Sequence, residues 1–106
     1  LMISHVRRIT LFSLLVISSH TFAAGDVARG EARGETCLGC HGVASYTNVY
    51  PTYKVPKLGG QHADYLAAAL KGYRSGERSH KTMRAQAANL SDQDIEDIAA
   101  YLASLK

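Results

Sequence analysis

Five consecutive residues constrain this chain more than any others: Cys37, Leu38, Gly39, Cys40 and His41. Two cysteines separated by two residues and followed at once by histidine are the pattern that attaches haem c. Cysteines spaced in this way on one helical turn point to the same side, so both thiols can form thioether bonds with the two vinyl groups of a haem. The histidine that follows then lies under the iron as an axial ligand. We therefore expect one covalently bound haem c.

Three other uses of a cysteine pair fit this pattern less well. A thioredoxin-like redox site expects a βαβ pattern, and no segment here alternates convincingly as a strand would. A zinc site needs further ligands, but the chain has only these two cysteines, and His62 and His80 are not closely spaced. A simple disulfide would leave the adjoining His41 unexplained. The motif therefore favours haem over the other three uses.

The first residues have the pattern of a secretory signal peptide. Arg7 and Arg8 supply positive charge, and residues 9–17 form an apolar run. A small-residue cleavage site follows, with Ala23 or Ala24 as its last residue. The apolar run is shorter than the roughly 20 residues that a membrane-spanning helix needs. We therefore expect cleavage, and no stable membrane insertion afterwards.

A signal peptide at 1–24 leaves one domain at 25–106, exported to the periplasm. Removing the segment changes the charge, because Arg7 and Arg8 leave with it. The 12 basic residues become 10 against 9 acidic ones, so the formal net charge falls from +3 to +1. A nearly neutral domain does not suggest a nucleic-acid-binding protein. A domain of this size is marginal without help, and a bound cofactor would supply it.

Three stretches of the domain read as helices. The first begins at Asp26, a good N-cap, and runs toward Cys37. The second spans about 61–74, and the third opens at Ser91 with the pattern of a capping box. The apolar stripe of the third consists of Ile95, Ile98, Leu102 and Leu105. Residues 42–60 read as a loop, which is long for so small a domain unless a large cofactor fills the space it encloses.

The second axial ligand of the iron is most readily supplied by Met83. It is the only methionine outside the predicted signal peptide, and it lies in a polar stretch, 79–84, that reads as a loop. A methionine ligand raises the reduction potential and suits electron transfer. His80 in the same stretch is the chief rival, and His62, at the start of the second helix, is another. The residues alone leave both rivals open.

Taken together, the chain resembles the small bacterial class I c-type cytochromes, and especially one haem lobe of their periplasmic di-haem members. The matching segments are 25–26, 37–42, 55–66, 73–83, 90–92 and 98–102. The resemblance implies an all-α fold of three to five helices wrapped around one covalently attached haem. A single attachment motif makes this a mono-haem chain, unlike the di-haem relatives.

The resemblance also implies roles for single residues. Pro56 matches the proline whose carbonyl oxygen accepts a hydrogen bond from the non-ligating nitrogen of the axial histidine, here His41. Gly30 matches the small residue where the first and last helices cross, with Tyr101 packed at that crossing. A tyrosine hydroxyl in the segment 43–54 is a candidate for bonding a haem propionate, with no choice among Tyr46, Tyr50 and Tyr53.

The function implied is electron transfer rather than enzymatic catalysis. A haem with both axial positions filled, by His41 and Met83, cycles between ferrous and ferric states. The stretch 54–84 carries seven basic and two acidic residues, so we expect redox partners with acidic docking surfaces. The alternative is a haem-binding subunit, sensor or enzyme with a labile sixth ligand site. A third alternative is the electron-transfer subunit of a larger oxidoreductase.

Overall fold

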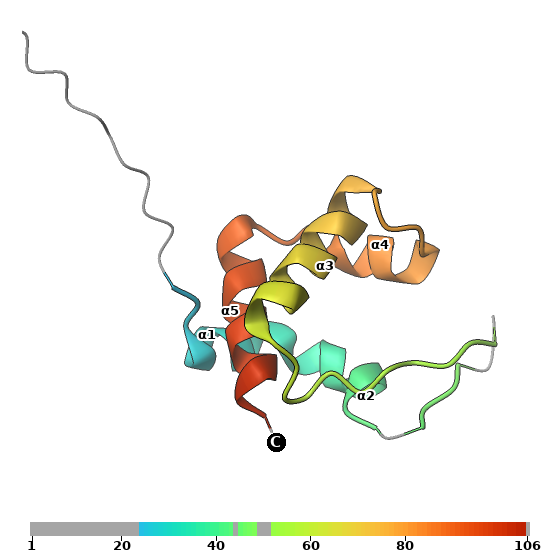
Figure 1. Ribbon diagram of the computed structural model, residues 1–106, viewed down its shortest axis with the longest axis horizontal. Coiled ribbons are helices and arrows are strands. Elements are labelled where there is room, and N and C mark those ends of the chain that lie inside the picture. Colours follow the sequence, from blue (N-terminus) through green and yellow to red (C-terminus); the bar gives the residue numbers. More distant parts are fainter. Residues whose placement is uncertain (1–23, 44, 49–51, 106) are drawn as a thin grey trace, which may run out of the picture.

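A computed structural model describes residues 24–43, 45–48 and 52–105, and within them the chain is helical (Figure 1). The predicted signal peptide lies outside the described residues, except for Ala24. The helices are α1 (Val27–Gly34), α2 (Leu38–His41), α3 (Ala63–Ser75), α4 (Lys81–Ala87) and α5 (Asp92–Ser104), with a 3₁₀ turn at Glu35–Cys37. The described residues contain no strand beyond an isolated bridge between Thr47 and Lys54. The all-α expectation is therefore confirmed.

The helices begin where short polar side chains cap them. The Asp26 carboxylate accepts a hydrogen bond from the Arg29 amide at 2.8 Å, which satisfies a free N–H at the start of α1. At α5, the Ser91 hydroxyl accepts from the Asp94 amide and the Asp94 carboxylate accepts from the Ser91 amide, each at 3.0 Å. This is the predicted capping box. None of the helices in the described part of the chain is both long and apolar enough to span a bilayer.

The first helix runs toward Cys37 as predicted, with α1 ending at the buried Gly34 and a 3₁₀ turn covering the remaining residues. One detail of the predicted helices is wrong. The stretch 79–84, expected to be a polar loop, instead enters α4. The His80 ring caps this helix, with Nδ1 accepting from the Met83 amide at 3.4 Å. Good helix formers continue it to Ala87, whose burial fixes it in place.

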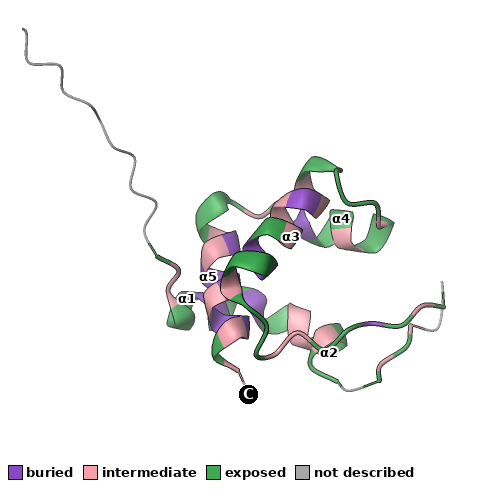
Figure 2. Cartoon of the chain, viewed as in Figure 1, coloured by how far each residue is buried: buried purple, intermediate pink, exposed green. Residues whose placement is uncertain are grey.

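Helix α5 is the centre of the fold and packs against both α1 and α3. Its fully buried residues Ile95 and Ile98, with Leu102, meet Leu66 and Ala67 of α3. Figure 2 shows that many of the buried residues lie on these two helices. The side chains of Cys37 and Leu38 pack against the same cluster. The hydrophobic core thereby holds the attachment motif against the rest of the domain.

Helix α1 crosses α5 at Gly30, as the resemblance implied. A Cβ atom on Gly30 would overlap the carbonyl oxygen of Asp97 and would lie 2.8 Å from the Cβ of the buried Tyr101. Only glycine permits this approach of the two backbones, because any side chain would push the helices apart. The crossing at Gly30 and Tyr101 is therefore confirmed.

One buried carboxylate ties the same two helices together. Asp97 is only 4% exposed. It accepts hydrogen bonds from Arg29 Nε at 2.9 Å, from the Asp26 amide at 2.7 Å and from Gln93 Nε2 at 2.9 Å. The Arg29 bond, followed by the Asp26 amide, lowers the pKa of Asp97 to about 2. The carboxylate is thus strongly preferred in its charged form in the folded protein.

The pKa of Asp97 predicts acid sensitivity of the α1–α5 contact. An unfolded aspartate has a pKa of roughly 3.9, whereas the folded pKa of Asp97 is about 2. The contribution of Asp97 is therefore fully present above about pH 4 and is lost as the pH falls toward 2. We expect Asp97→Asn to lower the urea midpoint at pH 7 and to flatten the loss of stability below pH 4. Urea unfolding followed by circular dichroism measures both.

Glu31→Gln is the matched control for this measurement. Glu31 is exposed on α1 and makes no ion pair with any other described residue, and its substitution changes the net charge by the same amount. It should leave the pH dependence of the urea midpoint as it is in the native chain. An Asp97→Asn variant with the native acid profile would show that Asp97 does not carry this dependence.

Candidate functional site

A cavity of about 600 Å³ opens between the helices and is walled mostly by apolar side chains. Helices α2 and α4 lie apart on its two sides, with α3 and α5 contributing Leu66, Leu70, Ile98 and Leu102. The extended segment before α3 completes the wall with Val55, Pro56 and Leu58. A volume of this size is in the range of protein sites for cofactors and other small molecules, roughly 300–1,000 Å³.

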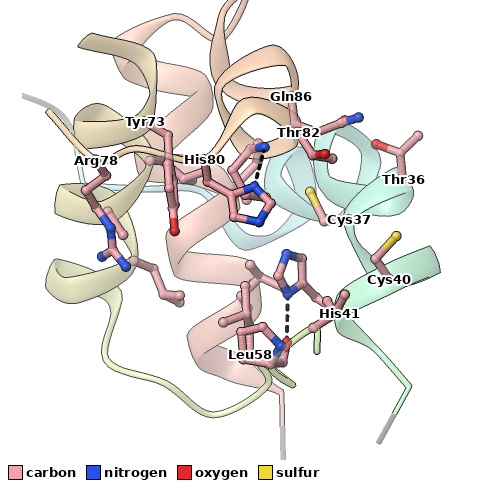
Figure 3. A pocket seen from close by; sticks show the side chains of 18 of the residues that line it. Thr36, Cys37, Cys40, His41, Leu58, Tyr73, Arg78, His80, Thr82 and Gln86 are labelled. Carbon is pink, nitrogen blue, oxygen red and sulfur yellow. Dashed lines mark hydrogen bonds between the residues drawn. The ribbon is translucent and has the colours of Figure 1, made fainter. Parts of the chain in front are cut away.

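Both cysteines of the motif line this cavity from one side (Figure 3). Cys37 closes the 3₁₀ turn and is half-buried, and Cys40 lies in α2 and is exposed. Both thiols are free in this structure. Burial raises the pKa of the Cys37 thiol, which keeps it protonated at neutral pH. The pair is thus presented as two thiols on one wall rather than as a disulfide.

His41 follows in the last position of α2 and also lines the cavity. Its Nδ1 lies 2.7 Å from the carbonyl oxygen of Pro56, and Figure 3 marks this bond. A carbonyl oxygen only accepts, so Nδ1 carries a proton, and in the neutral imidazole the lone pair is then on Nε2. A bond of this kind fixes the orientation of a ligating imidazole and raises its basicity. The Pro56 carbonyl oxygen thus lies within hydrogen-bond distance of the His41 ring.

Met83 reaches the same cavity from α4, where it is half-buried. His80 lines the cavity too, whereas His62 is exposed at the start of α3 and is absent from the described lining. His80 Nδ1 is engaged with the Met83 amide. The structure thus gathers Cys37, Cys40, His41, Pro56 and Met83 around one space, with His80 as a neighbour of the methionine.

Some lining residues were not singled out in the sequence. The Arg78 guanidinium lies 4.8 Å from the centre of the Tyr73 ring, and its NH1 is 3.4 Å from the Tyr65 hydroxyl. Among the described residues that line the cavity, the lysines and arginines are Lys54 and Arg78. Both fit the carboxylate groups of a haem. The matching segment 73–83 contained Arg78, but nothing local showed that it faces a cavity.

The three tyrosines of the segment 43–54 differ in their position relative to the cavity. Tyr53 lines the cavity. Tyr46 is half-buried and is not among the described residues that line it. Tyr50 lies outside the described residues. The hydroxyl of Tyr53 donates to Thr82 Oγ1 at 2.9 Å, across 29 residues of sequence. A pairing over that separation leaves no local signal in the sequence.

The basic stretch 54–84 is partly neutralised by the last helix. Lys71 Nζ lies 2.8 Å from Glu96 Oε1, and Arg74 NH2 lies 2.6 Å from Asp92 Oδ1. The Arg74 bond lowers the pKa of Asp92. The cations without an ion pair to another described residue are Lys54, Lys57, Arg78, Lys81 and Arg84.

These features fit a covalently bound haem. Two thiols lie on one wall, one imidazole has its Nε2 free, and one thioether reaches in from a separate helix. The apolar walls match a large apolar ring system, and the two cations match its acidic substituents. The donor set does not suit a structural zinc site, because the described residues contain no group of three or more His, Cys, Asp or Glu side chains placed so that they could hold one metal ion.

Comparison with known proteins agrees with this site. The family model described as cytochrome c matches residues 27–106. The chain is 39% identical over 98 residues to cytochrome c4 of Pseudomonas aeruginosa, covering 92% of the chain and 47% of the relative. It is 45% identical over 84 residues to cytochrome c-554(548) of Halomonas halodenitrificans, covering 76% of the chain and 98% of the relative.

A solved structure is similar to this chain in its fold. The crystal structure of reduced recombinant cytochrome c4 from Pseudomonas stutzeri superposes with a TM-score of 0.59 at 33% identity. The superposition covers 83% of this chain and 55% of the other. The chain thus spans about half the length of the cytochrome c4 relatives that it matches.

Proposed function

The chain belongs to the cytochrome c family, and we propose from this premise that it is an exported electron carrier rather than an enzyme. The observation that carries the proposal is the content of one cavity: two thiols, an imidazole held by the Pro56 carbonyl, and the thioether of Met83. Residues 1–24 would act as the signal peptide, and the domain at 25–106 would work in the periplasm.

Each site residue has one task in this proposal. Cys37 and Cys40 would hold haem c through thioether bonds, and His41 and Met83 would supply the two protein side chains to its iron. Pro56 orients His41 through the hydrogen bond at its Nδ1. When bound, the haem supplies an iron that alternates between the ferrous and ferric states. Two axial side chains supplied by the protein exclude oxygen and other small ligands from the metal, which suits electron transfer.

The unpaired cations suggest the chemistry of a partner. Lys81 and Arg84 flank Met83 on α4, and both are exposed. Positive charge around an electron-exchange site attracts acidic proteins and raises their association rate. We therefore expect the partners to have acidic docking surfaces.

Stopped-flow kinetics of the haem-loaded protein test this function. The reduced protein should pass one electron reversibly to an acceptor, and it should not bind carbon monoxide readily. With an acidic redox protein as acceptor, the rate should fall several-fold between about 10 mM and about 0.2 M ionic strength, because salt screens exposed charges over a Debye length of about 8–30 Å. Lys81→Gln should lower the low-salt rate more than Lys71→Gln, whose charge is paired with Glu96.

Two results would contradict the proposal. A high-spin spectrum, or rapid carbon monoxide binding by the untouched reduced protein, would indicate a labile sixth site and favour the sensor or enzyme alternative. A rate with the acidic acceptor that is flat against salt would refute the docking surface, while leaving the electron-carrier function in place.

A further inference from the structure

One short extended segment contacts both of the helices that carry the expected axial ligands. We call residues 53–56 the strap. At one end, the Tyr53 hydroxyl donates to Thr82 Oγ1 at 2.9 Å, and Thr82 directly precedes Met83. At the other end, the Pro56 carbonyl accepts from His41 Nδ1 at 2.7 Å. The strap therefore lies between the helix that carries Met83 and the helix that carries His41.

The strap is held in a defined conformation. The Tyr53 carbonyl accepts from the Asn48 amide and the Val55 amide donates to the Tyr46 carbonyl, both at 2.9 Å. The Val55 side chain is buried. Pro56 fixes its own φ angle and restricts the residue before it to extended conformations. These constraints let the strap act as a fixed support for whatever it contacts.

Tyr53 meets the first turn of α4 at two points. Its hydroxyl reaches Thr82, and its ring stands edge-on to the His80 ring, with centroids 4.7 Å apart at 88°. His80 caps the same turn through the Met83 amide. The far end of α4 is anchored by the fully buried Ala87, whereas Lys81 and Thr82 at its start are exposed. The contacts of Tyr53 and His80 are thus well placed to fix the turn that carries Met83.

We propose that Tyr53 is a positioning residue for the sixth iron ligand. By holding Thr82 and the His80 ring, it fixes the first turn of α4 and keeps the Met83 thioether at the iron. The inference rests on the proposed axial role of Met83. It predicts that loss of the Tyr53–Thr82 bond eases replacement of Met83 by an added ligand, while the haem stays attached.

Imidazole binding to the oxidised, haem-loaded protein tests the proposal. We expect Tyr53→Phe to bind imidazole about two- to tenfold more tightly than the native chain, the effect of one hydrogen bond. Thr82→Val removes the acceptor instead of the donor and should give an increase of similar size. The double variant should bind no more tightly than either single variant, because both changes break the same bond. Absorption titration measures the affinities, and the far-red iron–methionine band reports the methionine bond.

Tyr46→Phe is the matched control, since Tyr46 lies outside the strap and contributes only its backbone carbonyl to the contacts above. It should bind imidazole as the native chain does. Native affinity in Tyr53→Phe would overturn the proposal. An increase in Tyr53→Phe with none in Thr82→Val would also overturn it, because the hydroxyl would then act elsewhere, for example on a haem propionate. Absence of the far-red band from the native protein would instead remove Met83 as ligand, and both proposals would fail.

Discussion

Replacing Met83 with alanine is expected to abolish the far-red absorption band of the oxidised protein and to lower its reduction potential. A thioether favours ferrous iron, whereas water or a nitrogen ligand in its place favours ferric iron. We expect the potential to fall by on the order of 100 mV or more, since axial ligands spread haem potentials over about 0.8 V. The reduced variant should also bind carbon monoxide. Redox titration and absorption spectra of the haem-loaded variant measure these changes.

The control for this experiment is His80→Asn. Asparagine keeps a side-chain acceptor for capping α4 but cannot replace an imidazole on iron. Because His80 lines the same cavity and bonds the Met83 amide, it is the rival that must be tested. The far-red band should persist in His80→Asn. A native spectrum in Met83→Ala together with a high-spin spectrum in His80→Asn would assign the sixth position to His80.

Candidate site residues could be predicted from the sequence where they form a motif of adjacent residues or are the one residue of their type. Cys37, Cys40 and His41 follow from a local spacing, and Met83 followed from being the one methionine outside the predicted signal peptide. The role proposed for Pro56 and the crossing at Gly30 were predicted from the family resemblance rather than from the residues themselves. Their geometry depends on backbone atoms, a carbonyl oxygen and a missing Cβ, which a sequence pattern does not reveal.

Other features depend on contacts between distant segments. The start of α4 needs the His80 cap, an uncommon N-cap residue, so 79–84 resembled a loop. The Tyr53–Thr82 bond joins residues 29 positions apart. Two of the seven cations of 54–84, Lys71 and Arg74, pair with acids of α5, so the sequence count alone does not show how much of the positive charge is unpaired. In each case a tertiary neighbour decides the role of the residue, and local composition does not identify that neighbour.

Removing both thiols has the largest expected effect on the domain as a whole. In a Cys37→Ala, Cys40→Ala variant no thioether bond can form, so acidified organic solvent should extract all of the haem. Domains of this size bury only about 60–65% of their unfolded surface and depend on staples or bound groups. Without an attached haem, the side chains around the cavity of about 600 Å³ lose the contacts that they would make with it, and the folded state loses the stabilisation of a bound group. We expect little folded protein, measured by circular dichroism and by haem content.

The single variants should differ from each other because their environments differ. Cys37 is half-buried and packs against the core, whereas Cys40 is exposed. Each single variant keeps one thioether bond, but Cys37→Ala also loses packing, and should be less stable than Cys40→Ala by about 1 kcal/mol. Gly39→Ala is the control within the motif, since a Cβ at Gly39 meets no atom within 4 Å, and it should retain haem fully. Unextractable haem in the double variant would place the attachment outside Cys37 and Cys40.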